Sequence, residues 1–226
     1  MDSQRLSELL FPFLGSDAGD SSGTRGSHRS MLLSNSQLNS ISIYIDILLR
    51  WNARINLTAV RNPDEIVERH FGESLFAARN LFPPSEQQKG GLHLIDIGSG
   101  AGFPAIPIKI WAANLHVTLI ESNHKKTTFL MEVLRALTLT NIDVVVGRAE
   151  AFPGKAEVIT LRAVEQFAKI LPVAARLVMP GGRLALLIGR SQVQAVYAVR
   201  GFRWSEPRGI PLSANRVLII GRKEPW

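Results

Sequence analysis

The segment that most constrains the fold of this chain is residues 94–102. A run of apolar residues with one acid, Asp96, leads directly into Gly98, Gly100 and Gly102. Glycine lets a backbone take positive φ at no steric cost and lets a ligand approach closely. The pattern therefore predicts a buried strand that ends in a tight loop facing a ligand.

Alternating strand and helix patterns surround and follow this loop. Strands are expected at 92–97, 115–120, 142–146, 156–161 and 183–188, and helical segments at about 104–113, 124–137, 149–152, 163–179 and 191–200. Such alternation is typical of βαβ units, in which helices cover both faces of a parallel sheet. A last apolar run, 217–220, is expected to be a strand that closes one edge. A nucleotide-type cofactor would lie across the carboxyl ends of the parallel strands.

The part of the chain before residue 91 is predicted to be helical. Four leucine and phenylalanine residues share one face of a helix over 2–14. Residues 15–30 are rich in Gly, Ser and Asp and are expected to form a flexible loop. Ser34 and Gln37 form a capping box for a helix that extends to 52, and Asn62 followed by Pro63 starts another. We expect a helical N-terminal segment over 1–90 and a cofactor-binding domain over 91–226.

Composition limits the partners and the compartment. Lys and Arg total 26 against 19 Asp and Glu, for a net charge of +7, which suits a polyanion such as nucleic acid but is also compatible with an ordinary basic protein. The absence of cysteine excludes disulfides and thiolate zinc sites, and the five histidines lack a ligand spacing, so no metal is expected. No apolar run could span a bilayer, and residues 1–5 do not read as a secretion signal. We therefore expect a cytoplasmic protein.

Residues at the ends of the predicted strands are candidates for holding the cofactor. The carboxylate of Glu121 could accept hydrogen bonds from two ribose hydroxyls, or Glu121 could be a surface residue that starts a turn. Ala149 and Glu150 could hold an adenine edge, although this pair is also common at helix starts. Phe103 stands where a dinucleotide-binding fingerprint has its last glycine, which argues against a nicotinamide oxidoreductase. A tight connection with no ligand is the plainer alternative for the glycine loop.

Several short motifs occur together between about residues 50 and 190. They are 51–52, 56–60, 69–70, Ser74, 96–104, 106–110, 121–122, 125–126, 129–130, 148–150, 162–164 and 180–182. In combination they make the chain resemble the GidB-like rRNA methyltransferases, which are class I S-adenosylmethionine-dependent enzymes that methylate N7 of a guanine in bacterial 16S, small-subunit, rRNA. Three departures from the family pattern stand out, at Ala105, at Leu161 and at the pair Gly72-Glu73, where the second residue is usually Asp.

The resemblance implies a Rossmann-like α/β fold with a seven-stranded, mostly parallel sheet, one antiparallel strand at its edge, helices on both faces and a helical segment before it. It implies S-adenosylmethionine as the cofactor, with S-adenosylhomocysteine as the product. Cofactor contacts are implied at Gly98, Phe103, Ala149, Glu150 and Arg162. From the residues themselves, Asp96, Gly100, Gly102 and Glu121 join this predicted cofactor site.

The expected substrate is small-subunit rRNA, either free or in the 30S particle, and a monomer is the expected state. Guanine N7 carries a lone pair and no proton, so no general base is needed; Arg162 is the one candidate for a catalytic role, or it is in a surface ion pair. Candidates for phosphate contacts are Arg54, Arg69, His70, Lys125, Lys126, Arg148 and Arg216. Each could instead be a solvated charge, and His70 could be a packed core histidine. A methyltransferase for another RNA base and a non-catalytic ribosome-assembly protein that binds RNA remain as alternatives.

Overall fold

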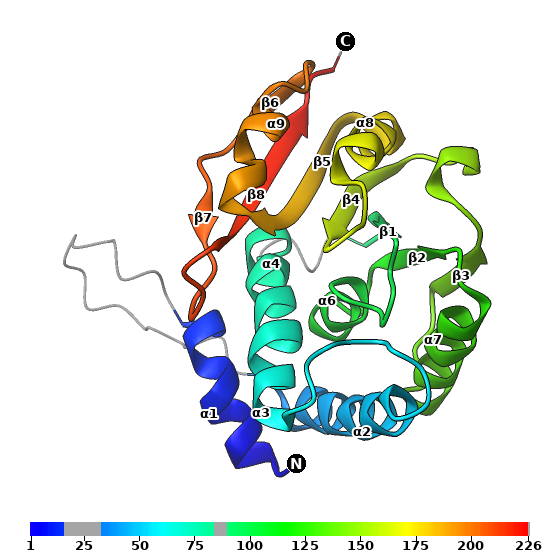
Figure 1. The fold of residues 1–226 in the computed structure, drawn as a ribbon, viewed down its shortest axis with the longest axis vertical. Helices are drawn as coiled ribbons and strands as arrows, with labels where there is room; N and C mark the ends of the chain where they lie inside the picture. The colour runs from blue at the N-terminus through cyan, green and yellow to red at the C-terminus, as the bar shows by residue number, and fades with distance from the viewer. Residues whose placement is uncertain (16–32, 84–89, 226) are drawn as a thin grey trace, which may run out of the picture.

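The computed structural model describes residues 1–15, 33–83 and 90–225. The flexible loop expected over 15–30 lies outside the described residues apart from Gly15. The described residues form a central sheet with helices packed against it (Figure 1). No helix among them is both long enough and apolar enough to cross a membrane.

The N-terminal part is helical, as its capping residues predict. The elements are α1 (Ser3–Leu14), α2 (Asn35–Asn52), α3 (Pro63–Ile66), the π-helical segment η1 (Val67–Gly72) and α4 (Glu73–Leu81). Ser34 begins α2 with the expected capping box, and the Asn62 side chain accepts from two backbone N–H groups at the start of α3. The helix predicted after Asn62 is confirmed, but its middle turn is a wider π-helix, a feature that is frequent at functional sites.

The sheet has eight strands in the described residues. They are β1 (His93–Ile97), β2 (His116–Glu121), β3 (Ile142–Val146), β4 (Ala156–Arg162), β5 (Val178–Gly189), β6 (Phe202–Trp204), β7 (Arg208–Gly209) and β8 (Arg216–Lys223). The order is β3-β2-β1-β4-β5-β8-β6, and β7 also pairs with β8. The first five strands are parallel, whereas β8 is antiparallel to β5, β6 and β7.

The predicted α/β class with a mostly parallel sheet is confirmed, with two corrections. The two-residue strand β7 raises the number of strands from the expected seven to eight. The run 217–220 does not close an edge of the sheet, because β6 and β7 pair with the side of β8 that faces away from β5. Paired on both sides, this apolar strand is protected from the solvent that an edge strand would meet.

Alternation along the strands divides the core between the two faces of the sheet. Leu94 of β1 packs in one cluster together with α1, α2, α4, α6 (Ala105–Trp111) and α7 (His124–Ala136). Its neighbour Ile95 packs in the other cluster, together with α8 (Phe167–Leu177) and α9 (Val193–Tyr197). Figure 1 shows α4 between α1 and α6, with α2 beside α6 and α7.

Three connections differ from the predicted helical segments. The helix expected over 163–179 begins only at Phe167, because Ala163 and Gln166 take left-handed φ values of 50° and 54°. The segment 149–152 is a single 3-10 turn, η2 (Ala149–Ala151), and 191–200 contains the 3-10 turn η3 (Arg190–Gln192) followed by α9. The residues between β4 and α8 thus form an irregular loop at the carboxyl end of the sheet.

Candidate functional site

A cavity of about 450 Å³ lies across the carboxyl ends of β1, β2 and β4. Gly98 and Glu121 border it at the first two of these strands, Ala149 and Glu150 come from η2, and residues 163–166 come from the loop after β4. Its volume falls within the range of about 300–1,000 Å³ that is usual for small-molecule sites. Its place is the one that a nucleotide-type cofactor takes in open parallel sheets.

The three glycines of the loop after β1 have different roles. All three have positive φ, from +57° at Gly100 to +83° at Gly102, as the glycine pattern predicts. Gly98 borders the cavity, and a Cβ there would lie 3.0 Å from Cγ1 of Val164, which borders the same cavity. Gly102 instead faces the protein, since its Cβ would lie 2.5 Å from the Tyr44 hydroxyl. Only the first of these two glycines therefore serves the approach of a ligand.

Glu121 holds the glycine loop and also borders the cavity. Its Oε2 accepts a hydrogen bond from the backbone N–H of Gly100 at 2.9 Å, and its Oε1 accepts from that of Asn123 at 2.8 Å. The side chain is buried, so these bonds fix the carboxylate in one orientation. A carboxylate has about four acceptor positions, so two remain that could serve the ribose hydroxyls considered from the sequence.

Asp96 lies beneath the loop rather than on the cavity wall. It is 1% exposed, and its Oδ1 accepts a hydrogen bond of 2.6 Å from Thr160 Oγ1. Burial raises the pKa of Asp96 from 3.8 to about 7, partly opposed by that hydrogen bond. Its second oxygen, Oδ2, is buried and has no hydrogen-bond partner among the described residues. Its carboxyl group thus links β1 to β4 under the site.

Two of the residues predicted to contact RNA phosphate border this cavity. They are Lys126 in the first turn of α7 and Arg148 just before η2. Lys169 of α8 adds a third cation to the wall, and the acids Glu121, Glu150 and Glu165 face them from the other elements. The cavity is therefore lined by charges of both signs, which suits a ligand that is itself charged at several points.

Arg162, the candidate catalytic residue, is in a buried ion pair and not in a surface one. Its side chain is 9% exposed, and its Nη2 and Nε donate to Oε2 of Glu73 at 3.0 and 3.2 Å. Nη2 also donates to the backbone oxygen of Arg69. On the other side of Glu73, Arg216 Nε lies 3.0 Å from Oε1. A single carboxylate from α4 thus connects the end of β4 with the start of β8.

His70 is a packed residue and carries no charge at neutral pH. Arginine can only donate, so His70 Nδ1 accepts from Arg162 at 3.1 Å, and the proton must lie on Nε2, 2.7 Å from Thr58 Oγ1. Burial, helped by the charge of Arg162, lowers the pKa of His70 to about 3. The ring stacks against Phe103. This position matches the packed-histidine alternative and gives no support to a phosphate contact.

Phe103 belongs to an aromatic cluster beneath the loop. Its ring is stacked with that of Tyr44 at 5.3 Å between centroids and meets Phe71 edge-on at 5.1 Å. The Tyr44 hydroxyl donates to the backbone oxygen of Ala101 within the glycine loop. Neither Phe103 nor Gly100, Gly102, Asp96 or Arg162 is among the residues that border the cavity. Their predicted cofactor contacts stay predictions.

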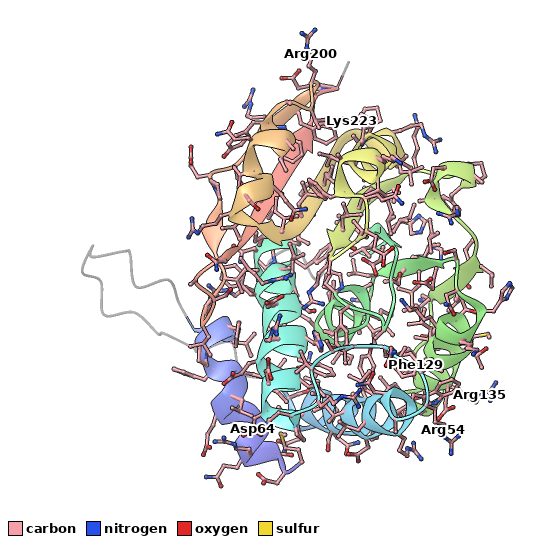
Figure 2. The ribbon with its side chains drawn as sticks, in the orientation of Figure 1. Arg54, Asp64, Phe129, Arg135, Arg200 and Lys223 are labelled. Carbon is pink, nitrogen blue, oxygen red and sulfur yellow. The ribbon has the colours of Figure 1, made fainter. Side chains whose placement is uncertain are left out.

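Of the remaining candidates for RNA contacts, Arg216 is partly buried against Glu73, whereas Arg54, Arg69 and Lys125 lie on the surface. Arg54 and Lys125 are exposed, and Figure 2 shows Arg54 pointing away from the molecule at the end of α2. Arg69 is 52% exposed and forms an i,i+4 ion pair with Glu65 at 3.1 Å. The motif at 51–52 and 56–60 contains a turn in which Asn52 Oδ1 accepts from the backbone N–H groups of Leu57 and Thr58. This turn places the Thr58 hydroxyl within hydrogen-bonding distance of His70.

Two residues that organise the site are not among the residues predicted from the sequence. Tyr44 lies within the apolar stripe of its helix, and Glu73 stands out in the sequence only as a departure from a family pattern. A signal was present for Glu73, since a carboxylate within a run of apolar residues needs a buried cation. The departures Ala105 and Leu161 are both fully buried and lie outside the cavity. Phe13 accounts for the glycine at position 72, because a Cβ at that position would lie 2.5 Å from the Phe13 ring.

Comparisons with known proteins agree on one family. The family model GidB, described as rRNA small subunit methyltransferase G, matches residues 37–201. A "Ribosomal RNA small subunit methyltransferase G" of Chloroflexus aggregans is 40% identical over 202 residues, which cover 83% of this chain and 82% of that protein. A protein of the same name from Xanthomonas campestris pv. campestris is 38% identical over 189 residues, covering 80% and 84%.

Among solved structures, magnesium protoporphyrin IX methyltransferase (ChlM) from Synechocystis PCC 6803 with bound SAM is similar to this chain with a TM-score of 0.61. The match covers 82% of this chain and 97% of that one at 15% identity. At this identity the likeness concerns the fold alone.

Proposed function

The chain belongs to the family of rRNA small subunit methyltransferase G, and we propose that it transfers a methyl group from S-adenosylmethionine to N7 of one guanine in 16S rRNA. The observation that carries the proposal is the cavity across the carboxyl ends of β1, β2 and β4, in which Gly98 leaves room for a ligand and Glu121 presents a fixed carboxylate. We further propose a cytoplasmic monomer that acts on the rRNA or on the 30S particle.

The residues of the cavity fit S-adenosylmethionine. The molecule carries a carboxylate, an ammonium, a sulfonium and ribose hydroxyls, and the wall offers cations, anions and the fixed acceptors of Glu121. Gly147 also borders the cavity, and a Cβ there would meet no atom within 4 Å, so the backbone is open to a ligand. We propose that Gly98 and Glu121 hold the methionine and ribose parts and that Ala149 and Glu150 hold the adenine.

When bound, the cofactor supplies an activated methyl group on a sulfonium. Guanine N7 provides the electron pair for the new C–N bond, and the electrons of the broken C–S bond return to sulfur, so no proton has to be removed. The residues of this chain then act by positioning and by charge. Arg162 is held rigidly by Glu73 next to the loop after β4, where it orients the groups around the methyl donor.

The test is methyl incorporation from labelled S-adenosylmethionine into purified 16S rRNA and 30S particles, followed by cleavage chemistry selective for N7-methylguanine. We expect label at a single guanine. Label on another base would show that the chain is a methyltransferase but would reject guanine N7 as its target. Cofactor binding without any label on either substrate would favour the non-catalytic RNA-binding alternative. Sedimentation of the same preparation tests the monomer.

A further inference from the structure

A second cavity, of about 430 Å³, lies between the N-terminal helices and the segment that precedes β8. Phe13 of α1, residues Glu68 and Arg69 of η1, and Glu73 of α4 form one side. Residues 211–216 form the other side. Its volume is within the usual range for sites that bind small molecules. None of the residues predicted from the sequence to contact the cofactor borders it.

This second cavity adjoins the cofactor cavity through one ion pair. Glu73 borders the second cavity, and its Oε2 accepts from Arg162 at 3.0 Å. The residues that directly follow Arg162, from Ala163 to Gln166, border the cofactor cavity. The Glu73–Arg162 pair therefore lies between the two spaces. A methyl acceptor must sit next to the donor, and a subsite that adjoins the cofactor cavity meets this requirement.

The lining of the second cavity matches a flat ligand that both donates and accepts hydrogen bonds. Arg216 contributes a buried Nη2 that has no hydrogen-bond partner among the described residues, although Nε lies against Glu73. A buried donor without an acceptor is unfavourable, so a ligand oxygen would stabilise it. Glu68 brings a carboxylate, and Ser213 and Asn215 bring further polar groups. Guanine presents an O6 acceptor next to its N1–H and N2–H donors.

The mouth of this cavity carries an unusual leucine. Leu212 is 67% exposed and has a φ of +58°, a conformation that a leucine rarely adopts. Such strain persists only where the surrounding structure imposes it, and it concentrates at functional sites. An exposed apolar side chain at this place can stack on a base or fill the gap that a displaced base leaves.

We propose that the second cavity is the subsite for the guanine that is methylated. Arg216 donates to O6, the Glu68 carboxylate accepts from the N1–H and N2–H groups, and Leu212 packs against the neighbouring base of the RNA. Holding the base by this edge leaves N7 free on its other edge, toward Arg162. The carboxylates of Glu68 and Glu73 also stabilise the positive charge that methylation creates on the base. This assignment rests on the proposed function.

The first test separates contact with RNA from folding. We expect Leu212→Ala to lower kcat/KM for RNA by about tenfold or more, because a base that stacks on the leucine loses its contact, with an unchanged Kd for S-adenosylmethionine. Leu212→Gly should lower it equally while leaving the protein at least as stable, since glycine removes the φ strain. Met131→Ala, which also truncates an exposed apolar side chain, at a residue of α7 that is 47% exposed, is the matched control and should keep full activity. Wild-type kcat/KM in both Leu212 variants would overturn the assignment.

The second test identifies the base edge. Once the labelling experiment has located the guanine, inosine is placed there in a reconstituted substrate, which removes only the N2 amino group. We expect wild-type enzyme to lose about tenfold in kcat/KM on the inosine substrate, and Glu68→Gln to treat both substrates alike at the lower rate. Equal discrimination by the wild type and the variant would reject Glu68 as the partner. If wild-type enzyme labels no RNA at all, the proposed function fails, whereas active wild type with unaffected variants rejects only this subsite.

Discussion

Single glycines in the loop after β1 decide whether a ligand can enter. Gly98 faces the cavity and Gly102 faces Tyr44, although both occupy the left-handed region. Only at Gly98 would a longer side chain project into the space where a cofactor is proposed to bind. A substitution at Gly98 therefore tests whether the cavity binds the cofactor, and a substitution at a glycine away from the cavity controls for the backbone strain.

We expect Gly98→Asp to abolish binding of S-adenosylmethionine. The new Cβ would lie 3.0 Å from Val164, and the carboxylate would stand in the cavity next to Glu121. The matched control is Gly181→Asp, at φ +75° with nothing within 4 Å of its Cβ. Both changes should cost about 1–2 kcal/mol in unfolding free energy because of the φ strain. Calorimetric titration checks the binding, and a normal Kd for Gly98→Asp would contradict the proposed cofactor site.

The buried carboxyl of Asp96 should make stability depend on pH. Because its pKa is raised from 3.8 to about 7, the folded protein holds this proton more tightly than the unfolded chain does. The resulting stability is fully present below pH 3.8 and is lost as the pH rises through about 7.

Asp96→Asn removes this titration and keeps an acceptor for Thr160. We therefore expect the variant to gain stability relative to wild type between about pH 5 and pH 8, by up to a few kcal/mol, since one pKa unit corresponds to about 1.4 kcal/mol. Urea unfolding at both pH values measures the difference. Parallel stability curves for the two proteins would show that Asp96 does not titrate as its burial requires.

At the scale of elements, α4 is connected to the carboxyl edge of the sheet by charge. Glu73 at its start is 3% exposed and is shared between Arg162 of β4 and Arg216 of β8. Burial by itself lowers the pKa of Arg162, and Glu73 opposes that effect. Removing the carboxylate would leave two guanidinium groups facing each other with little solvent around them.

We expect Glu73→Gln to lower the unfolding free energy by about 3–5 kcal/mol, the usual effect of breaking a buried ion pair from one side. Asp64→Asn is the control, because it breaks the ion pair with Arg5, whose two side chains are 48% and 42% exposed. That loss should be at most about 1 kcal/mol. Denaturant unfolding compares the two variants, and similar small losses would mean that Glu73 is solvated.

At the scale of the whole molecule, the N-terminal helices and the sheet share one core. The cluster that contains Leu6 and Leu48 also contains Leu94 and Val117 of the sheet. Polar contacts cross the same boundary: Gln37 Nε2 donates to the backbone oxygen of Ile110 at 2.9 Å. The segments 1–90 and 91–226, proposed as separate units from the sequence, are therefore expected to depend on each other.

We predict a single cooperative unfolding transition for the whole chain, with the same midpoint by tryptophan fluorescence and by far-UV circular dichroism. S-adenosylmethionine should raise that one midpoint, because binding to the folded state alone stabilises everything that unfolds with it. Two separate transitions, of which the cofactor raises only one, would instead indicate two independent domains.

Local patterns were sufficient for much of this fold. The strands at 92–97 and 142–146 lie within one residue of β1 and β3, because buried parallel strands produce continuous apolar runs. The helix starts at Ser34 and Asn62 were predicted from side chains that cap their own backbone. The late start of α8 was not predicted, since the left-handed residues Ala163 and Gln166 carry no glycine or asparagine signal.

The order of strands and helices, the glycine loop and the family could be predicted from the sequence, because periodicity, capping and glycine chemistry act between residues that are close in the chain. Which side chains meet over long separations depends on the tertiary structure. It made His70 a neutral, packed residue, brought Lys126 to the cavity that Glu121 borders, and joined Glu73 to Arg162 and Arg216. A charge or pKa depends on what surrounds a group in space, and burial and partners are set when distant segments pack.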